Sequence, residues 1–274
     1  MSSAPTTRIS RLFERLKTVE QRPALIGYLT AGDPSPARTA GLVAALVRGG
    51  VDLIELGVPF SDPIADGPVI QRAADRALCA GMTLHGVLDI ARQVREQSDV
   101  PLLLFTYMNP VIRYGLSALA RDAAAAEIDG CLLTDMSVEE AEPYIGAMRE
   151  NNLDTVFLAA PTSTPRRLEL VAKYSSGFVY LVSRTGVTGE QQRLSQSALP
   201  LIERTRQVTD LPLAMGFGIA TREHVSEVGE FTDGVVVGSA IVRTIEKCGA
   251  GPELEQNLET FTRDLAAGLK RRNS

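Results

Sequence analysis

Residues 51–68 read Val51-Asp-Leu-Ile-Glu-Leu-Gly57 and then Val-Pro-Phe-Ser-Asp-Pro-Ile-Ala-Asp-Gly-Pro68. The first seven residues have the length and apolar character of a β-strand, in which successive side chains point to opposite faces. Glu55 then shares a face with Leu53, while Ile54 and Leu56 occupy the other face. If Ile54 and Leu56 pack against helices, Glu55 points into the interior of a barrel.

An acidic side chain at a strand end has two interpretations. An isolated buried glutamate is usually neutralised by a nearby arginine, because buried acids are rarely left unpaired. Here the strand is followed by a loop that carries two more acids, Asp62 and Asp66. Active sites of parallel barrels are built from the loops that follow the strands. This context favours a catalytic glutamate over a structural ion pair.

Apolar runs of strand length recur eight times along the chain, and their near-continuous apolar character is typical of parallel strands buried on both faces. We expect strands at residues 24–30, 51–57, 102–107, 130–135, 154–160, 177–183, 211–216 and 234–238. Segments with helical spacing of apolar residues, such as 37–47 and 84–94, lie between them. The alternation predicts an α/β protein, a (β/α)8 TIM barrel. Residues 9–19 predict an extra N-terminal helix that caps the barrel bottom, and residues 253–270 predict an extended C-terminal helix.

The length and charge of the chain limit its domain count and its partners. Its 274 residues suit one domain, because α/β barrels commonly reach about 250 residues, so we expect a single domain over 1–274 with a flexible segment at 1–8. The net charge of −5 supplies no basic surface for nucleic acid. The first ten residues lack the apolar core of a signal peptide, and no apolar stretch approaches the roughly 18 residues of a membrane span. We expect a cytoplasmic protein with no membrane partner.

Several kinds of site are not indicated. The three cysteines lack C-x-x-C spacing and the two histidines, His85 and His224, are far apart in sequence, so neither a disulfide framework nor a zinc site is predicted. No lysine ends any expected strand, which leaves Schiff-base chemistry without a nucleophile. Histidine and aspartate are not clustered as a metal-dependent aldolase would require. We therefore expect neither a metal nor a cofactor.

Glycine-rich segments follow the last three expected strands, in loops where TIM barrels commonly hold phosphate. Gly216-Phe-Gly-Ile219 follows strand seven, and Gly238-Ser239 begins a helix after strand eight, where backbone amides and the helix dipole attract anions. Arg184-Thr-Gly-Val-Thr-Gly189 follows strand six and could supply amides or close as a lid. Each segment alone is also explained by tight-turn geometry. Their combination in one barrel favours a phosphate site.

Polar residues at other strand ends are also candidates for the barrel mouth. Tyr28 and Thr30 end strand one, Tyr107 and Asn109 end strand three, and Asp135 ends strand four. The two tyrosines could equally be core residues with solvated hydroxyls, which is a common place for tyrosine. The sequence leaves both interpretations open.

The chain resembles the tryptophan synthase alpha subunit family along nearly its whole length. The likeness rests on segment 55–68 together with Gly27-Tyr-Leu-Thr-Ala-Gly-Asp-Pro34, Tyr107-Met-Asn-Pro110, Ala160-Pro-Thr162, Ser183-Arg-Thr-Gly-Val-Thr-Gly189, Gly216-Phe-Gly-Ile219 and Gly238-Ser-Ala-Ile-Val242. The resemblance implies cleavage of indole-3-glycerol phosphate to indole and glyceraldehyde 3-phosphate in L-tryptophan biosynthesis. It also implies a tryptophan synthase beta subunit as partner in an α2β2 heterotetramer. One departure is Ser137, which stands where the family usually has proline and is expected to loosen that loop.

The resemblance also implies roles for individual residues. Glu55 becomes the catalytic acid/base and Asp66 the second catalytic carboxylate. The expected substrate-binding residues are Tyr28, Thr30, Tyr107, Tyr180 and Thr188, and the expected phosphate-binding residues are Gly189, Gly218, Gly238 and Ser239.

Two alternative functions remain open at this stage. Another phosphate-binding barrel, such as a sugar-phosphate isomerase or epimerase, would need a second acid/base at another strand end and no apolar cavity of indole size. A binding or regulatory subunit would keep ligand affinity without turnover. The presence of both Glu55 and Asp66 argues against this second alternative.

Overall fold

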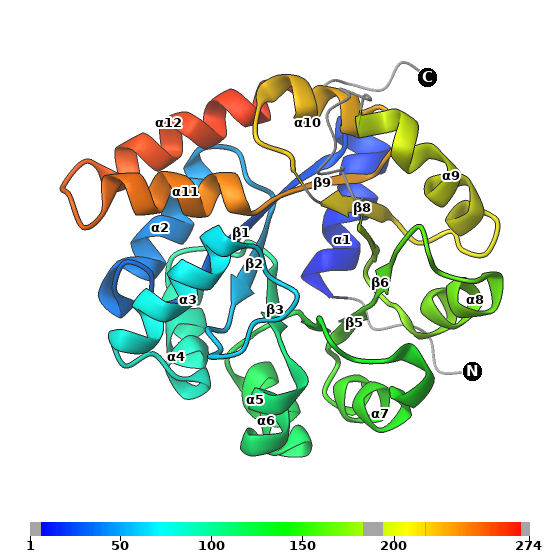
Figure 1. Ribbon diagram of the computed structural model, residues 1–274, viewed down its shortest axis with the longest axis horizontal. Coiled ribbons are helices and arrows are strands. Elements are labelled where there is room, and N and C mark those ends of the chain that lie inside the picture. Colours follow the sequence, from blue (N-terminus) through cyan, green and yellow to red (C-terminus); the bar gives the residue numbers. More distant parts are fainter. Residues whose placement is uncertain (1–6, 183–193, 217, 270–274) are drawn as a thin grey trace.

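The computed structural model describes residues 7–182, 194–216 and 218–269. Nine parallel strands form one sheet in the order β5-β4-β3-β2-β1-β9-β8-β7-β6, and helices surround it (Figure 1). The two end strands of this order, β5 and β6, are consecutive in the chain and separated only by Phe157. The sheet is therefore nearly closed, which confirms the predicted TIM barrel.

The strands are β1 (Ala24–Thr30), β2 (Leu53–Gly57), β3 (Leu102–Thr106), β4 (Gly130–Leu133), β5 (Asp154–Val156), β6 (Leu158–Ala159), β7 (Val179–Val182), β8 (Leu213–Gly216) and β9 (Gly234–Val237). The α-helices are α1 (Arg8–Arg15), α2 (Pro36–Arg48), α3 (Pro68–Cys79), α4 (Leu84–Arg95), α5 (Met108–Tyr114), α6 (Leu116–Ala125), α7 (Glu142–Glu150), α8 (Pro165–Tyr174), α9 (Leu194–Arg206), α10 (Arg222–Gly229), α11 (Ser239–Cys248) and α12 (Leu254–Ala266). A π-helical turn, Leu16–Glu20, extends α1, and a 3-10 turn, Val138–Glu140, precedes α7. None of the described helices is long and apolar enough to cross a membrane.

The observed elements differ from the predicted ones at β5 and β6, at α3, at α5 and at the end of α12. The predicted strand 154–160 is divided into β5 and β6, so nine observed strands correspond to eight predicted ones. Helix α3, directly after the loop that carries Asp66, and the short helix α5 were not predicted. The long C-terminal helix is α12, which ends at Ala266 rather than at residue 270. Helix α3 begins with a proline at its first turn, a start signal that the sequence did contain.

The core has two layers, and they decide which way Glu55 points. Ile54 and Leu56 belong to the cluster between the strands and the outer helices. Leu53 belongs to a second cluster inside the barrel, together with inward residues of the other strands and with Leu12 and Phe13 of α1. The predicted facing of β2 is therefore confirmed, and α1 closes the bottom of the barrel as expected.

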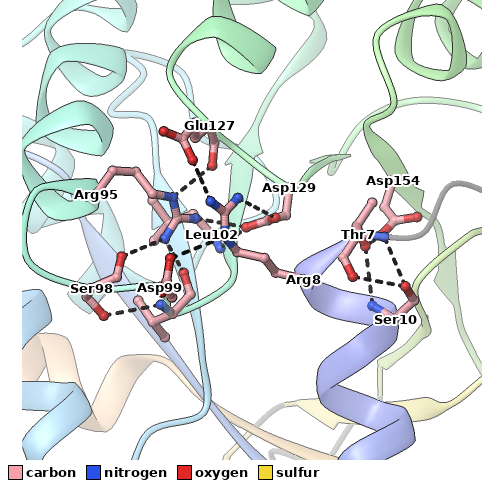
Figure 2. Close-up of polar contacts among 11 residues, drawn as sticks. Thr7, Arg8, Ser10, Arg95, Ser98, Asp99, Leu102, Glu127, Asp129 and Asp154 are labelled. Atoms are coloured by element: carbon pink, nitrogen blue, oxygen red, sulfur yellow. Dashed lines mark hydrogen bonds and ion pairs between the residues drawn. The ribbon is translucent and has the colours of Figure 1, made fainter.

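The first described residues are held tightly at the barrel bottom. The Thr7 hydroxyl accepts a hydrogen bond from the Ser10 amide at 3.2 Å and caps α1, and it donates to the buried carboxylate of Asp154 (Figure 2). Arg8 donates to Asp129 at 3.2 Å and to Glu127. Thr7 and Arg8 thus contact the folded body, and residues 1–6 of the segment expected to be flexible lie outside the described residues.

Asp129 is the centre of this network (Figure 2). Its carboxylate accepts from Arg8, from Arg95 at 2.8 Å and from the Leu102 amide at 2.9 Å. The side chains of Arg95 and Asp129 are only 6% and 4% exposed, so this ion pair is hardly solvated. A buried pair of this kind is costly to break, because the remaining charge loses its partner away from water.

We predict that Asp129→Asn lowers the free energy of unfolding by about 3 kcal/mol or more, because it leaves the buried Arg95 charge unpaired. Urea unfolding followed by circular dichroism measures the change. The matched control is Asp89→Asn, which breaks the solvent-exposed pair between Asp89 and Arg92 and should cost under about 0.5 kcal/mol. Equal unfolding midpoints for the two variants would contradict the role given to Asp129.

Candidate active site

A cavity of about 490 Å³ opens at the carboxyl ends of the strands. The loop between β2 and α3, the start of α11 and the loop after β8 form its rim, and inward side chains of the strands form its walls. The residues that line it are Tyr28, Glu55, Ala65, Asp66, Gly67, Ile70, Phe105, Thr134, Leu158, Tyr180, Val182, Gly218, Ile219, Ala220, Val236, Gly238, Ser239, Ala240 and Arg243. Both predicted catalytic carboxyl groups therefore face one cavity.

Glu55 lies in the wall of this cavity without an ionic partner. The residue is 1% exposed, and its Oε1 atom has no hydrogen-bond partner among the described residues. No arginine pairs with it in the part of the chain that the structure describes, so the alternative of a structural ion pair is wrong. Burial raises the pKa of Glu55 to about 8, because a carboxylate is poorly solvated there. At neutral pH the group is protonated and can donate a proton.

Asp66 has a different environment on the loop between β2 and α3. The Tyr107 hydroxyl donates to its Oδ2 atom at 2.9 Å and accepts from the Ala65 amide at 3.1 Å. Burial raises the pKa of Asp66 to about 6, and the hydrogen bond from Tyr107 opposes that shift by stabilising the charged form. Asp66 is therefore ionised at neutral pH while Glu55 is protonated. Two carboxyl groups held in opposite states can divide acid and electrostatic roles between them.

Two tyrosines reach the cavity from different strands, Tyr28 from β1 and Tyr180 from β7, and glycines make room for them. Tyr28 packs edge-on against Phe105, with 5.2 Å between ring centroids. A Cβ atom at Gly57 would lie 2.3 Å from the Tyr28 hydroxyl oxygen, and one at Gly216 would lie 2.3 Å from that of Tyr180. Both distances are far inside van der Waals contact. The glycines that end β2 and β8 are thus required by the tyrosines beside them.

Other predicted site residues occupy supporting positions. Thr30 is buried beneath the cavity wall and its hydroxyl lies 3.3 Å from that of Tyr28. Tyr107 acts through its hydrogen bond to Asp66 and does not line the cavity itself. Asp135 accepts from the Met108 amide at 2.7 Å and so caps the start of α5. Thr188 and Gly189 lie outside the described residues.

The predicted phosphate-binding glycines do come together. Gly218 follows β8, and Gly238 and Ser239 follow β9, and all three line the cavity at its rim. Ser239 begins α11, and no side chain caps that helix, so its first amides are available to a ligand. Gly218 has a φ of 71°, a backbone conformation that residues other than glycine rarely adopt. The arrangement presents backbone amides and a helix N-terminus to one side of the cavity.

The sequence did not identify the apolar walls of the cavity. Phe105, Leu158, Val182, Ile219 and Val236 line it. The signal was available for four of them, because the alternation that placed Glu55 inside the barrel also places the strand residues Phe105, Leu158, Val182 and Val236 inside it, whereas Ile219 follows β8. Arg243 and Thr134 line the cavity as well and were not singled out. The described residues contain no cluster of three or more potential metal ligands.

Ser137, where the family usually has proline, lies at the start of the 3-10 turn before α7. Its hydroxyl donates to the Glu139 carboxylate at 2.6 Å. This contact closes the turn locally, in place of the restriction that a proline ring would impose.

Comparison with known proteins agrees with the fold. The family model described as tryptophan synthase alpha chain matches residues 13–270. The tryptophan synthase alpha chain of Solibacter usitatus is 68% identical over 263 residues, covering 96% of this chain and 98% of that protein. That of Geotalea uraniireducens is 44% identical over 264 residues, covering 96% and 98%.

Solved structures give the same result. A tryptophan synthase structure from Mycobacterium tuberculosis superimposes with a TM-score of 0.88 at 38% identity, covering 99% of this chain and 100% of that one. The tryptophan synthase subunit alpha of Legionella pneumophila superimposes with a TM-score of 0.86 at 34% identity, covering 96% and 98%. With a family model matching nearly its whole length and close relatives over the same span, the chain belongs to the tryptophan synthase alpha chain family.

Proposed function

We propose that this chain cleaves indole-3-glycerol phosphate to indole and glyceraldehyde 3-phosphate, with Glu55 as the proton donor and Asp66 as the electrostatic partner. The observation that carries the proposal is the state of Glu55. It is a buried, unpartnered carboxyl group with a pKa of about 8, in the wall of a cavity that also holds the ionised Asp66. The family membership supports the same reaction and its place in tryptophan biosynthesis.

The reaction is a retro-aldol cleavage in which carbon is the leaving group. Glu55 donates its proton to ring carbon C3, and the positive charge spreads to the ring N–H. Asp66 accepts a hydrogen bond from that N–H and stabilises the charge as it develops. The bond between C3 and the glycerol chain then breaks, and its electron pair returns to the ring to give neutral indole. The glycerol hydroxyl proton passes to a base, either the Glu55 carboxylate formed in the first step or water, and this leaves the aldehyde.

The apolar walls favour this substrate over the sugar-phosphate alternative. Phe105, Leu158 and Val236 offer no hydrogen bonds to the hydroxyl groups of a sugar. They do provide flat apolar contact for an aromatic ring, since apolar surface is stabilised when it leaves water. The glycerol phosphate end of the substrate then extends toward Gly218, Gly238 and Ser239.

We also propose a tryptophan synthase beta subunit as partner, in an α2β2 heterotetramer. Indole is small and apolar, so a second active site that receives it directly prevents its escape. The loop between β2 and α3 is suited to the contact, because the partly buried Phe60 and Pro63 flank the exposed Asp62, and Ile64 is 83% exposed, whereas Pro59 is buried. Phe60 also packs against Tyr107 with 5.3 Å between ring centroids. The proposed contact surface therefore adjoins the residue that orients Asp66.

Removing the proposed acid tests the mechanism. We predict that Glu55→Gln lowers indole formation by at least about 10²-fold, because the amide keeps the shape but cannot transfer the proton. Asp66→Asn should also be nearly inactive, since an amide offers no negative charge to the ring N–H. An indole assay measures turnover, and calorimetry with glycerol phosphate checks that both variants still bind the phosphate end. Wild-type turnover in Glu55→Gln would overturn the assignment.

The two raised pKa values predict a bell-shaped pH profile. Activity should rise as Asp66 loses its proton near pH 6 and fall as Glu55 loses its proton near pH 8. The measurement is kcat/KM for indole formation from about pH 5 to pH 9. A profile that is flat between pH 7 and pH 9 would contradict a protonated Glu55.

Stability gives an independent check of the same pKa. Below pH 4.5 the Glu55 carboxyl is protonated in both the folded and the unfolded chain, and between pH 4.5 and about 8 only the unfolded chain loses the proton. The wild type should therefore become progressively less stable than Glu55→Gln as the pH rises through this window, by up to a few kcal/mol. Urea unfolding of both proteins at several pH values measures the difference, which should stay constant above about pH 8.

The phosphate site predicts an effect at Gly218. We expect Gly218→Val to weaken the binding of substrate and of glycerol phosphate together, by about tenfold or more, because valine is strained at a φ of 71° and blocks close approach to the backbone. Calorimetry measures both affinities. The matched control is Gly81→Val, which introduces the same residue at a φ of 81° away from the cavity. It should lower stability without changing phosphate affinity.

The proposed partner contact predicts a change in activation rather than in basal rate. The isolated chain should be a slow monomer that a beta subunit accelerates by about tenfold or more, since binding that favours closed loops shifts their population. Asp62→Ala should reduce this activation far more than it reduces the basal rate. Titration of each protein with a beta subunit in the indole assay measures both. A fully active isolated chain that responds to no beta subunit would instead favour a free-standing indole-producing lyase.

A further inference from the structure

The cavity that is lined by the two carboxyl groups is also lined by one cationic side chain. Arg243 of α11 is the only lysine, arginine or histidine among the described residues that line it. The remaining charged residues of the lining are Glu55 and Asp66. A phosphate ester carries about 1.5 to 2 negative charges near neutral pH, so the ionised Asp66 repels it. Backbone amides carry only partial positive charges, so by themselves they offset this repulsion incompletely.

The position of Arg243 on its helix directs it toward the phosphate end. Arg243 is four residues after Ser239, so the two residues lie on the same face of α11 one turn apart. Side chains on a helix lean toward its N-terminus and cover the preceding turn. The Arg243 side chain therefore extends along the turn that begins with Ser239 and Gly238, where the proposed phosphate site lies.

The neighbouring arginines are engaged elsewhere. Arg72 of α3 donates to the Glu246 carboxylate at 2.7 and 2.8 Å, and Arg76 donates to Glu246 at 3.0 Å and to Asp33 at 2.7 and 2.9 Å. These contacts clamp α11 against α3 and hold its first turn at the cavity. Arg243 itself is exposed and forms no ion pair with any residue of 7–182, 194–216 or 218–269. Its guanidinium is available to an incoming anion.

We propose that Arg243 determines the specificity of this cavity for a dianionic phosphate ester, by pairing its guanidinium with the phosphate held at Gly238 and Ser239. This inference rests on the proposed function. It concerns only the phosphate end of the substrate. A guanidinium presents a planar fork of donors that matches two phosphate oxygens, which a single ammonium group does not. Arg243 thus binds substrate and takes no part in proton transfer at the indole ring.

The test compares three variants of the purified chain. Arg243→Gln removes the charge, Arg243→Lys keeps the charge without the fork, and Lys247→Gln removes a charge one turn further along α11, away from the cavity. For Arg243→Gln we expect KM for indole-3-glycerol phosphate to rise by about tenfold and kcat to change by less than about twofold, since the lost contact is a charge-assisted hydrogen bond. Arg243→Lys should recover part of the loss. Lys247→Gln should match the wild type.

Two further measurements separate phosphate recognition from a structural effect. The dissociation constant of glycerol phosphate, measured by calorimetry, should rise in Arg243→Gln by the same factor as KM. The difference from wild type should shrink as salt is raised from about 0.01 M to 1 M, because screening weakens the contact at the exposed rim. Unfolding midpoints should be equal for all three variants, since Arg243 is exposed.

The possible failures are distinguishable. If Arg243→Gln and Lys247→Gln have the same KM and the same glycerol phosphate affinity as the wild type, the inference about Arg243 is overturned while the proposed function stands. If Arg243→Gln lowers kcat and leaves KM unchanged, Arg243 is not a phosphate-binding residue, and the inference fails as well. If the wild type forms no indole yet binds glycerol phosphate through Arg243, the proposed reaction fails and the phosphate pairing stands.

Discussion

The site depends on the cost of keeping a carboxyl group without an ionic partner inside the barrel. Glu55 is buried among inward side chains that are nearly all apolar, so its charged form is disfavoured and its pKa rises to about 8. An arginine within reach would pair with it and lower that pKa, leaving a carboxylate with no proton to give. The apolar lumen therefore suits the proposed proton donor by keeping cations away from Glu55, and the one cation of the described lining lies at the rim, on α11.

The rest of the barrel supports this arrangement by closing one end and leaving the other open. Helix α1 fills the bottom with Leu12 and Phe13, and Arg8 ties its start to the buried Asp129. Water is thereby kept out from below, which preserves the low polarity around Glu55. The mouth is formed by loops and by the start of α11, where unpaired amides face a ligand. The same strands thus provide a dry interior and a polar rim, as barrel enzymes require.

The sequence could predict the strands and the facing of Glu55, because both follow from short-range alternation and apolar run length. It could not predict that Asp135 caps α5, since that contact joins the segments after β3 and β4, which are brought together only by the pairing of those strands. Arg243 was missed for a similar reason, as an arginine four residues into a helix resembles a solvated surface residue unless the cavity is known. Helix α3 was missed because it has several exposed polar residues and directly follows a loop rich in proline, so the segment resembled a continuation of that loop. When the role of a residue depends on neighbours that are distant in sequence, the structure is needed to identify it.

The loop between β2 and α3 connects the outer surface to the reacting atoms by direct contacts. Phe60 packs on the Tyr107 ring, the Tyr107 hydroxyl holds Asp66, and the Ala65 amide donates to the same hydroxyl. A partner that presses on Phe60 therefore moves the group that fixes the Asp66 carboxylate, without any change in the barrel strands. Glu55, on a strand that pairs with both β1 and β3, is not reached by this path. Under the proposed mechanism, partner binding should accordingly tune charge stabilisation at the ring nitrogen and leave proton donation at C3 unchanged, because Asp66 lies on the contacted loop whereas Glu55 lies within a strand paired on both sides.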